Sequence, residues 1–322
     1  CGVCEMLCEA HAINFDAKEE LLDLDVGTII LATGFDNFQP DELGQYGYGR
    51  SPNVLSGIEF ERMSNSGGPT GGEIITADGE KPERVAIIHC VGSRDKHSHE
   101  YCSRVCCMYA LKQAHLVRDK TDAEVFEFYM DMRTFGKGYE EFYERIQEEG
   151  VVFVRGRGTE VVVGQDGKLT VKAEDTNLGR PVSATVDMVI LGAGIVPQAD
   201  TAQVAQTFGI SRSPDGFFME AHPKLRPFHT NTDGVFLAGT CQAPRDIPDT
   251  VAHANAAAAE ALALMSAGEV TIAPTIAWVD ETLCSGCKTC LNLCPYKAIV
   301  FTSRNGAHAG SGVAEVNEAL CK

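Results

Sequence analysis

Residues 232–256 read TDGVFLAGTCQAPRDIPDTVAHANA, and this stretch decides the fold. Its first part, residues 232–240, is an apolar run ending in Ala-Gly-Thr, which predicts a buried strand with a small-residue turn at its end. Its second part is rich in alanine and carries Pro248 and Asp249 at its start, which predicts a helix. A helix start offers free N–H groups and partial positive charge, which can stabilise an anionic group. The alternative is a surface alanine-rich helix that follows a core strand.

Three further apolar runs have the composition of buried strands: residues 25–34, 84–90 and 186–197. The first ends in Ala32-Thr33-Gly34, small residues that let a ligand approach the backbone. A helix-like stretch from about Tyr101 to Lys120 follows the second run. Strands that alternate with helices predict an α/β fold.

The sequence lacks the signature of a nicotinamide site. No G-x-G-x-x-G follows a strand, and the turn after residue 88 reads HCVGSRD, which is too poor in glycine to admit a pyrophosphate. The Gly-x-Gly at residues 192–194 is not a phosphate loop, because Pro197 stands where the helix would begin and no third glycine follows. We therefore expect a nucleotide-type domain that has lost NAD(P) binding.

Cysteine is the other main signal, with ten of thirteen residues falling in three tight groups. Within residues 284–294 the spacing is C-x2-C-x2-C-x3-C followed by Pro295, the ferredoxin pattern that wraps a [4Fe–4S] cluster. Zinc sites instead place two cysteine pairs a dozen or more residues apart. Disulfides are disfavoured because the chain is long and shows no export signal.

The two ends of the chain repeat this motif. CGVCEMLCEAHAINF, residues 1–15, aligns without gaps on CKTCLNLCPYKAIVF, residues 287–301, although Glu9 replaces the proline. Residues 316–321 likewise repeat residues 279–284. We expect both termini to be truncations of a longer polypeptide. The predicted cluster ligands in these segments are Cys1, Cys4, Cys8, Cys284, Cys287, Cys290, Cys294 and Cys321.

A third cysteine set, in HCVGSRDKHSHEYCSRVCCMYALKQAH, stands where a nicotinamide would need its phosphate loop. Adjacent Cys106 and Cys107 are about 100° apart on a helix, but a helix start can aim both at one cluster. With Cys90 and Cys102 they form a predicted [4Fe–4S] site. The alternative is that Cys90 and one of the adjacent pair are buried small hydrophobic residues.

Composition narrows the class of protein. The 322 residues carry a net charge of −18 and 44% hydrophobic residues, enough for two packed domains. The charge disfavours nucleic acid and anionic membranes as partners, since both need clustered Lys and Arg. No apolar run reaches the roughly 18 residues of a membrane span, so we expect a cytoplasmic protein without membrane insertion.

A family likeness extends over essentially the whole chain. The stretches HCVGSRD, YCSRVCCMYALKQA, DMRTFGKGYEEFYERIQEEGVVFVRGR and AGTCQAPRDIPDTVAHANAAAAEA resemble the A-type subunit of heterodisulfide reductase. The resemblance implies a thioredoxin-reductase-like two-dinucleotide flavoprotein fold with α+β ferredoxin-like modules, holding FAD and multiple [4Fe–4S] clusters. It implies five parts: the end of an inserted ferredoxin module (1–20), the FAD domain (21–82 and 198–270), a degenerate NAD(P)-like domain carrying a cluster (83–197) and a truncated ferredoxin module (271–322).

The resemblance also assigns the flavin contacts. Thr240 stands where the superfamily usually has Asp, so the contact with the ribityl chain is altered. Two lysines are candidates for tuning the flavin: Lys112, five residues past Cys107, and Lys137 in the FGKGY turn. A cation beside the flavin ring favours the reduced anion, although an exposed lysine with no role is the alternative. The expected cofactor-binding residues are Ala32, Thr33, Gly34, Gly239, Thr240, Asp249, Thr250, Val251, Ala252 and His253.

In activity, the resemblance implies an electron-bifurcating component of a heterodisulfide reductase complex in methanogenesis. The implied partners are the B-type and C-type subunits, a hydrogenase or dehydrogenase electron donor and ferredoxin, in a dimer of complexes. One alternative is the flavoprotein of a quinone-interacting membrane-bound oxidoreductase. Others are an NAD(P)H-dependent oxidoreductase of the glutamate synthase small-subunit type, and a non-catalytic cluster-bearing scaffold.

Overall fold

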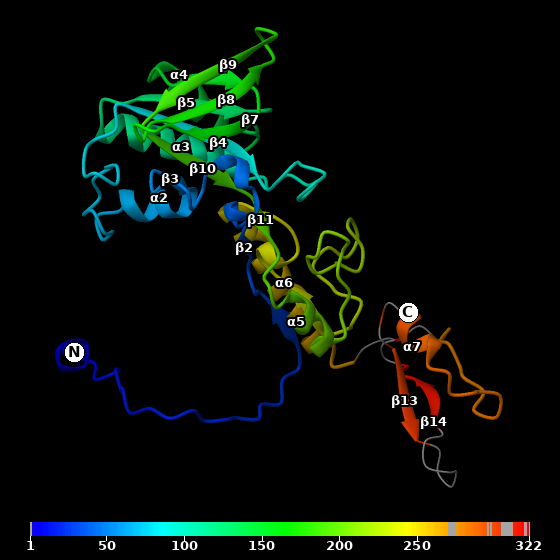
Figure 1. Cartoon of the computed structure of the whole chain (residues 1–322). Helices are drawn as coiled ribbons and strands as arrows, with labels where there is room; N and C mark the ends of the chain where they lie inside the picture. Colours follow the sequence, from blue (N-terminus) through cyan, green and yellow to red (C-terminus); the bar gives the residue numbers. More distant parts are fainter. Residues whose placement is uncertain are drawn as a thin grey trace.

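The computed structural model describes residues 2–269, 275–294, 296, 298–303, 312–318 and 321 (Figure 1). Its larger body is built on a five-stranded sheet in the order β3-β10-β4-β5-β6. Every neighbouring pair in this sheet is parallel. The strands are β3 (Val54–Ser56), β10 (Met188–Ala193), β4 (Arg84–Val91), β5 (Glu124–Tyr129) and β6 (Val152–Arg155).

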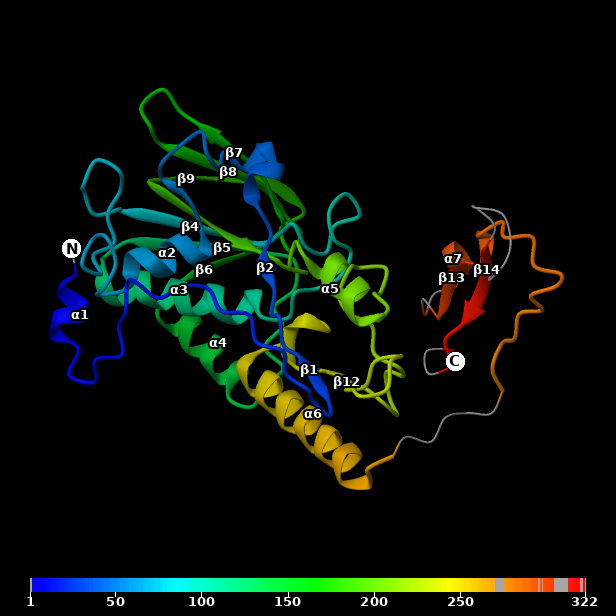
Figure 2. The ribbon, with the colours of Figure 1, turned by 90° about the horizontal axis from the view of Figure 1, so that it is seen from below.

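Helices and a second sheet cover the two faces of this parallel sheet. Figure 2 shows α2 (Gly57–Ser64), α3 (Cys106–Lys120) and α4 (Tyr139–Glu148) together along one side. The antiparallel strands β7 (Gly158–Val163), β8 (Leu169–Asp175) and β9 (Arg180–Val186) pack against the other face. Because β4 is covered on both faces, its residues from Val85 to Val91 are all buried, as a central parallel strand requires.

The smaller body pairs two distant segments. Strand β1 (Ile29–Leu31) lies parallel to β12 (Val235–Leu237), with α5 (Thr201–Phe208) and α6 (Ile247–Ala267) packed around them. Ala257 and Ala261 of α6 contact Phe236 and Ala238, since small side chains allow the helix to approach the strand closely. The antiparallel ribbon of β2 (Asp36–Asn37) and β11 (Ile195–Val196) joins this body to the larger one (Figure 1).

The structure differs from the sequence expectations in two places. The strand expected over residues 25–34 is hydrogen-bonded only over Ile29–Leu31, because β12 offers three partner residues and the preceding segment is exposed. Residues 54–64, expected in the FAD domain, form β3 and α2 and pair with β10 in the larger body. The short 3-10 helices of the described chain are η1 (Pro40–Glu42), η2 (Gly44–Tyr46) and η3 (Gly239–Cys241).

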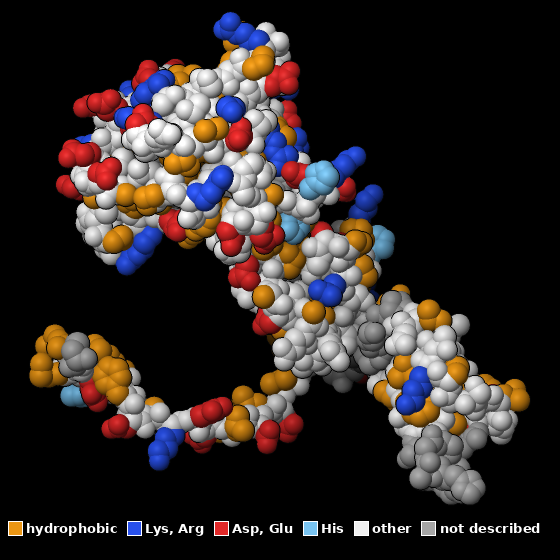
Figure 3. All heavy atoms as spheres, viewed as in Figure 1, with side chains coloured by type: hydrophobic (Ala, Val, Ile, Leu, Met, Phe, Trp, Pro, Cys, Tyr) orange, Lys and Arg blue, Asp and Glu red, His pale blue; other side chains and the backbone are white. Residues whose placement is uncertain are grey.

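The terminal segments carry the ferredoxin-type cysteines. Helix α1 (Val3–Leu7) begins the described chain, and α7 (Thr289–Leu293) precedes the hairpin of β13 (Ile299–Ser303) and β14 (Gly312–Val316). In Figure 1 both segments lie apart from the two bodies. Among the described residues, no helix has the length and apolarity needed to span a membrane. Acidic side chains are spread over the face of the larger body in Figure 3.

Candidate functional site

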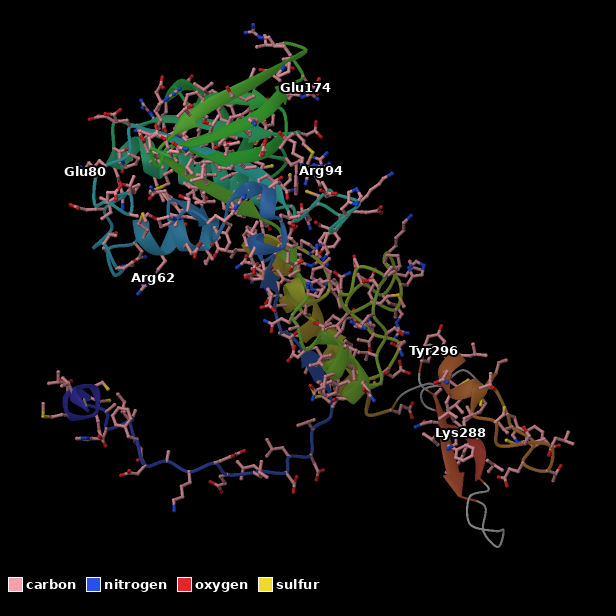
Figure 4. The ribbon with its side chains drawn as sticks, viewed as in Figure 1. Arg62, Glu80, Arg94, Glu174, Lys288 and Tyr296 are labelled. Atoms are coloured by element: carbon pink, nitrogen blue, oxygen red, sulfur yellow. The ribbon has the colours of Figure 1, made fainter. Side chains whose placement is uncertain are left out.

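The cysteine turn, defined here as residues 90–107, connects the end of β4 to the start of α3. Cys90 has a left-handed backbone with φ 59, and Gly92 and Arg94 follow with φ 73 and φ 54. Figure 4 labels Arg94, which projects from this end of the sheet. A left-handed conformation costs a non-glycine residue about 1–2 kcal/mol. The strand therefore ends in a strained turn where a dinucleotide-binding domain has its phosphate loop.

The other three cysteines of this turn gather at the start of α3. The helix begins at Cys106, not near Tyr101 as expected, because Arg104 has a left-handed φ of 62 and interrupts any earlier turn. Cys106 and Cys107 are its first two residues and both are buried. No side chain caps this helix start, so its free N–H groups favour negative charge. The backbone N–H of Arg104 points to Cys102 Sγ at 3.3 Å.

The four sulfurs influence one another electrostatically. Burial, reinforced by the neighbouring Cys107 and Cys102 thiols, raises the pKa of Cys90 to about 11. Burial and the Cys90 thiol raise the pKa of Cys106 further. Burial would also raise the pKa of Cys107, but the hydrogen bond and charge of His89 beside it lower that pKa overall. Of the three buried thiols in the turn, Cys107 is therefore the one that most readily becomes a thiolate, the form that ligates iron.

The turn supplies four cysteine thiols, the donor set that a [4Fe–4S] cluster takes. In the described part of the chain, no three His, Cys, Asp or Glu side chains lie close enough to hold one metal ion. The four free cysteines of this turn fit that donor set.

Two glycines bring β10 and β11 against the end of β4 and the cysteine turn. A Cβ at Gly192 would lie 2.9 Å from Ile88 O, and one at Gly194 would lie 2.9 Å from Ser103 Oγ. Gly194 N donates to Val91 O at 2.8 Å, and Ile195 N donates to the Ser103 hydroxyl at 2.8 Å. The Gly-x-Gly of residues 192–194 therefore serves close packing around the cysteines.

A cavity of about 610 Å³ adjoins the cysteine turn, and we call it the α2–α3 cavity. This volume lies within the roughly 300–1,000 Å³ of small-molecule sites. Lys112 lines it and forms an ion pair with Glu61, Nζ to Oε1, at 2.6 Å. Gln113 also lines it, and Gln113 Oε1 is a buried acceptor without a hydrogen-bond partner among the described residues. A cation and an orphaned amide oxygen in one cavity fit the polar edge of a flavin ring.

The flavin contacts expected in the smaller body converge where β1 and β12 end. Ala238 N donates to Leu31 O at 2.9 Å, which sets Ala32-Thr33-Gly34 beside Gly239 and Thr240. Gly239 has φ 76, and a Cβ there would lie 3.0 Å from Thr250 Cγ2, so this position needs glycine. His253 is buried, and its Nδ1 accepts a hydrogen bond from Gly239 N at 2.9 Å. His253 thus holds the turn against α6.

The start of α6 is connected to the cysteine turn. Asp246 caps the helix by accepting from Asp249 N at 2.9 Å, and Val251 of the first turns is exposed, as is Ala252. Arg104 donates to Asp249 Oδ2 at 2.6 Å, and Tyr139 donates to Asp246 Oδ2 at 3.2 Å. The larger body therefore contacts the α6 start through two polar interactions.

The remaining predicted residues lie elsewhere. Lys137 lies in the turn before α4 and does not line the α2–α3 cavity. Cys1 lies outside the described residues. The terminal cysteines in the described part of the chain surround α1 and α7 and are exposed or half-buried: Cys4, Cys8, Cys284, Cys287, Cys290, Cys294 and Cys321.

Two family matches cover separate parts of the chain. Residues 109–261 match the pyridine nucleotide-disulphide oxidoreductase family, and residues 277–300 match the 4Fe-4S binding domain. The first match includes most of α3 and the strand–helix stretch of residues 232–256. The second includes all four cysteines of residues 284–294. They imply a flavin and a [4Fe–4S] cluster, and they confirm the predicted fold class.

Curated relatives cover nearly the whole chain. The A-type subunit of the H2:CoB-CoM heterodisulfide,ferredoxin reductase of Methanothermobacter thermautotrophicus is 52% identical over 98% of this chain and 48% of that protein. The A-type subunit of the H2/formate:CoB-CoM heterodisulfide,ferredoxin reductase of Methanococcus maripaludis is 47% identical over 92% of this chain and 46% of that protein. The chain belongs to the family of heterodisulfide reductase A-type subunits. The resemblance found in the sequence is thereby confirmed, and the chain spans about half the length of the curated relatives it matches.

Solved structures give a weaker likeness than these family members. The thioredoxin reductase of T. acidophilum has a TM-score of 0.48 at 16% identity, over 75% of this chain and 66% of that one. The thioredoxin reductase of Lactococcus lactis has the same TM-score at 19% identity, over 74% and 66%.

Several polar residues of this site were not predicted. Glu61 pairs with Lys112 from a different helix, and Arg104 pairs with Asp249 from 145 residues away. Glu127 forms a buried pair with His89. Arg104 stands between two predicted ligands, and that position was a usable signal. Nothing in the sequence pointed to Glu61 or Glu127, because each pairs with a residue of another helix or strand.

Proposed function

We propose that the chain is the electron-transfer part of a heterodisulfide reductase complex and carries electrons between FAD and [4Fe–4S] clusters. One observation carries the proposal: four cysteines occupy the turn between β4 and α3, and Arg104 among them pairs with Asp249 in the first turn of α6, where we propose the flavin binds. A cluster at this position would accept or deliver electrons where related folds bind a nicotinamide. The family membership supports the same conclusion.

We further propose electron bifurcation and the partners that accompany it. Relatives are named for H2, formate, ferredoxin and F420H2, always with the CoB-CoM heterodisulfide. By analogy, electrons would pass between a hydrogenase or dehydrogenase, ferredoxin and the disulfide-reducing B-type and C-type subunits, in a dimer of such complexes. A role in methanogenesis follows from the organisms of these relatives.

The proposed residue roles follow the two bodies. FAD would lie across the ends of β1 and β12 and the α6 start, contacted by residues 32–34, 239–240 and 249–253, with its ring towards the α2–α3 cavity. When bound, this cofactor takes an electron pair and releases the electrons one at a time. The α6 start and Lys112 would stabilise negative charge on the ring. We retain the expected five-part division of the chain, with residues 54–64 moved to the cluster domain.

The full-length protein, isolated without oxygen, tests the function. We expect bound FAD and iron in excess of about four atoms per polypeptide, since more than one [4Fe–4S] site is proposed. Reduced ferredoxin should bleach the flavin absorbance, whereas NADH and NADPH should not, because the cysteine turn replaces the phosphate loop. Rapid bleaching by NADPH, or a protein without flavin, would contradict the proposal.

Lys112 can be tested against Lys137. Replacing Lys112 by Met removes a cation from the α2–α3 cavity and should lower the two-electron flavin potential by roughly 30 mV, about 1.4 kcal/mol. The effect is modest because Lys112 is half exposed and already paired with Glu61. Lys137→Met is the matched control, since Lys137 lies outside the cavity. Anaerobic potentiometry measures both, and equal potentials in the two variants would remove Lys112 from the mechanism.

A further inference from the structure

Two ionisable side chains are completely enclosed behind the cysteine turn. His89 of β4 and Glu127 of β5 form a pair at 2.8 Å, Nε2 to Oε2, with side chains 1% and 0% exposed. Each also has a second polar atom, His89 Nδ1 and Glu127 Oε1, that is buried without a hydrogen-bond partner among the described residues. The pair therefore has unused hydrogen-bonding capacity in the core.

Such a pair is a poor way to stabilise a fold. Moving two charges out of water costs several kcal/mol per ion, and replacement by well-packed apolar residues is often neutral or stabilising. The positions around the pair on β4 are apolar, with Ile87 and Ile88 fully buried. Burial of unsatisfied polar atoms in a native core calls for a functional explanation.

The sheet register shows what the pair faces. Glu127 lies opposite Ile87, and His89 is two residues beyond Ile87, so the side chains of Ile87 and His89 share one face of the sheet. Ile87 packs on the face covered by α3. Cys107 is the second residue of α3, the helix that covers this face, and it is among the residues that raise the pKa of His89. One polar neighbour of His89 besides Glu127 is therefore a proposed cluster ligand.

We propose that His89 and Glu127 are positioning residues for the cluster of the cysteine turn. His89 Nδ1, which has no hydrogen-bond partner among the described residues, would donate to the Cys107 thiolate when that thiolate ligates the cluster. A ligated thiolate has no proton to give, so the proton in this contact must lie on Nδ1. Glu127 holds Nε2 and thereby fixes the ring orientation. Hydrogen bonds to cluster sulfurs help set the reduction potential, and a donor here stabilises the more negative reduced state.

This inference rests on the proposed cluster of the cysteine turn. The test is an anaerobic redox titration of the full-length protein followed by electron paramagnetic resonance, with Cys107→Ala used to identify the signal of this cluster. His89→Gln retains an N–H near the Nε2 position for Glu127 but loses the donor to Cys107. We expect about tenfold less reduced cluster at a fixed potential, a downward shift of about 59 mV.

Matched variants separate tuning from damage to the fold. His89→Asn retains an N–H near the Nδ1 position and should titrate close to the wild type. The double variant His89→Leu with Glu127→Leu removes both buried charges and should show the lowered potential even where the single variant folds poorly. His115→Leu is the control outside the site, because His115 pairs with Glu149 at 2.8 Å in a half-exposed position on α3.

The outcomes are distinguishable. The tuning role is overturned if the cluster potential is unchanged in both His89→Gln and the double variant. It is also overturned if His89→Asn and His89→Gln lower the potential equally. Either result leaves the proposed function standing. A Cys107→Ala protein that loses no signal and no iron overturns the cluster itself, and the tuning role with it. The expected pattern is a lower potential in His89→Gln and the double variant only.

Discussion

Replacing Cys107 by alanine should remove about four iron atoms from each polypeptide, the content of one [4Fe–4S] cluster. Cys107 is buried at the start of α3, and the His89 beside it favours its thiolate over the thiol. Three remaining cysteines would leave one corner of the cube without a ligand in a site that excludes most water. Elemental analysis of the anaerobically purified full-length protein measures the loss.

Cys241→Ala is the control for this experiment. Cys241 is as buried as Cys107, at 3% against 5% exposure, but it lies in the smaller body, where its Sγ contacts Leu31 O at 3.2 Å. Its replacement should leave the iron content unchanged. An unchanged iron content in Cys107→Ala would mean that the buried cysteines of the turn are ordinary core residues. This is the alternative stated from the sequence, in which they act as small hydrophobic side chains.

The sequence was sufficient to predict features that depend only on residues close together in the chain. The cysteine spacing of residues 284–294 and the alternating strands and helices depend on neighbours within a few residues, and the family matches confirm both. The gathering of Cys90 with Cys106 and Cys107 was also predictable, because the end of a parallel strand lies near the start of the next helix.

Contacts between distant segments could not be predicted in the same way. The pairs Lys112–Glu61 and Arg104–Asp249 depend on how separate elements meet, and no periodicity links their positions. The predicted length of β1 was wrong for a similar reason, because an apolar run forms a strand only as far as its partner strand extends. The site between the bodies is thus the part that needed the structure.

One contact at that junction connects the flavin side to the cluster side. Phe38 follows β2, is buried at 3% exposure and lies over the cysteine turn, where Gly92 leaves room for its ring. Phe38 N also donates to Gly194 O at 2.8 Å, in the strand pair that packs on the same turn. A side chain at position 92 would therefore disturb the cysteine turn and the β2–β11 ribbon together.

Gly92→Ala should lower the apparent free energy of unfolding by about 3 kcal/mol, combining a left-handed alanine with an overpacked core. The added Cβ would overlap the Phe38 ring, and the backbone at φ 73 cannot relax without moving Cys90. Iron content should fall as well, because the ligand turn is displaced. Gly79→Ala shares a left-handed φ of 86 but meets nothing within 4 Å, so it should cost only about 1 kcal/mol and keep its iron.

Urea denaturation followed by circular dichroism, with iron analysis of the same samples, compares the two glycine variants. The difference between their free energies of unfolding isolates the contact with Phe38, because both variants carry the same kind of backbone strain. Restoring space with Phe38→Leu in the Gly92→Ala protein should recover part of the stability, as expected for two residues in direct contact. Equal stability of the Gly92 and Gly79 variants would show that the turn accommodates a side chain, and that Phe38 does not tie the β2 segment to the cluster ligands.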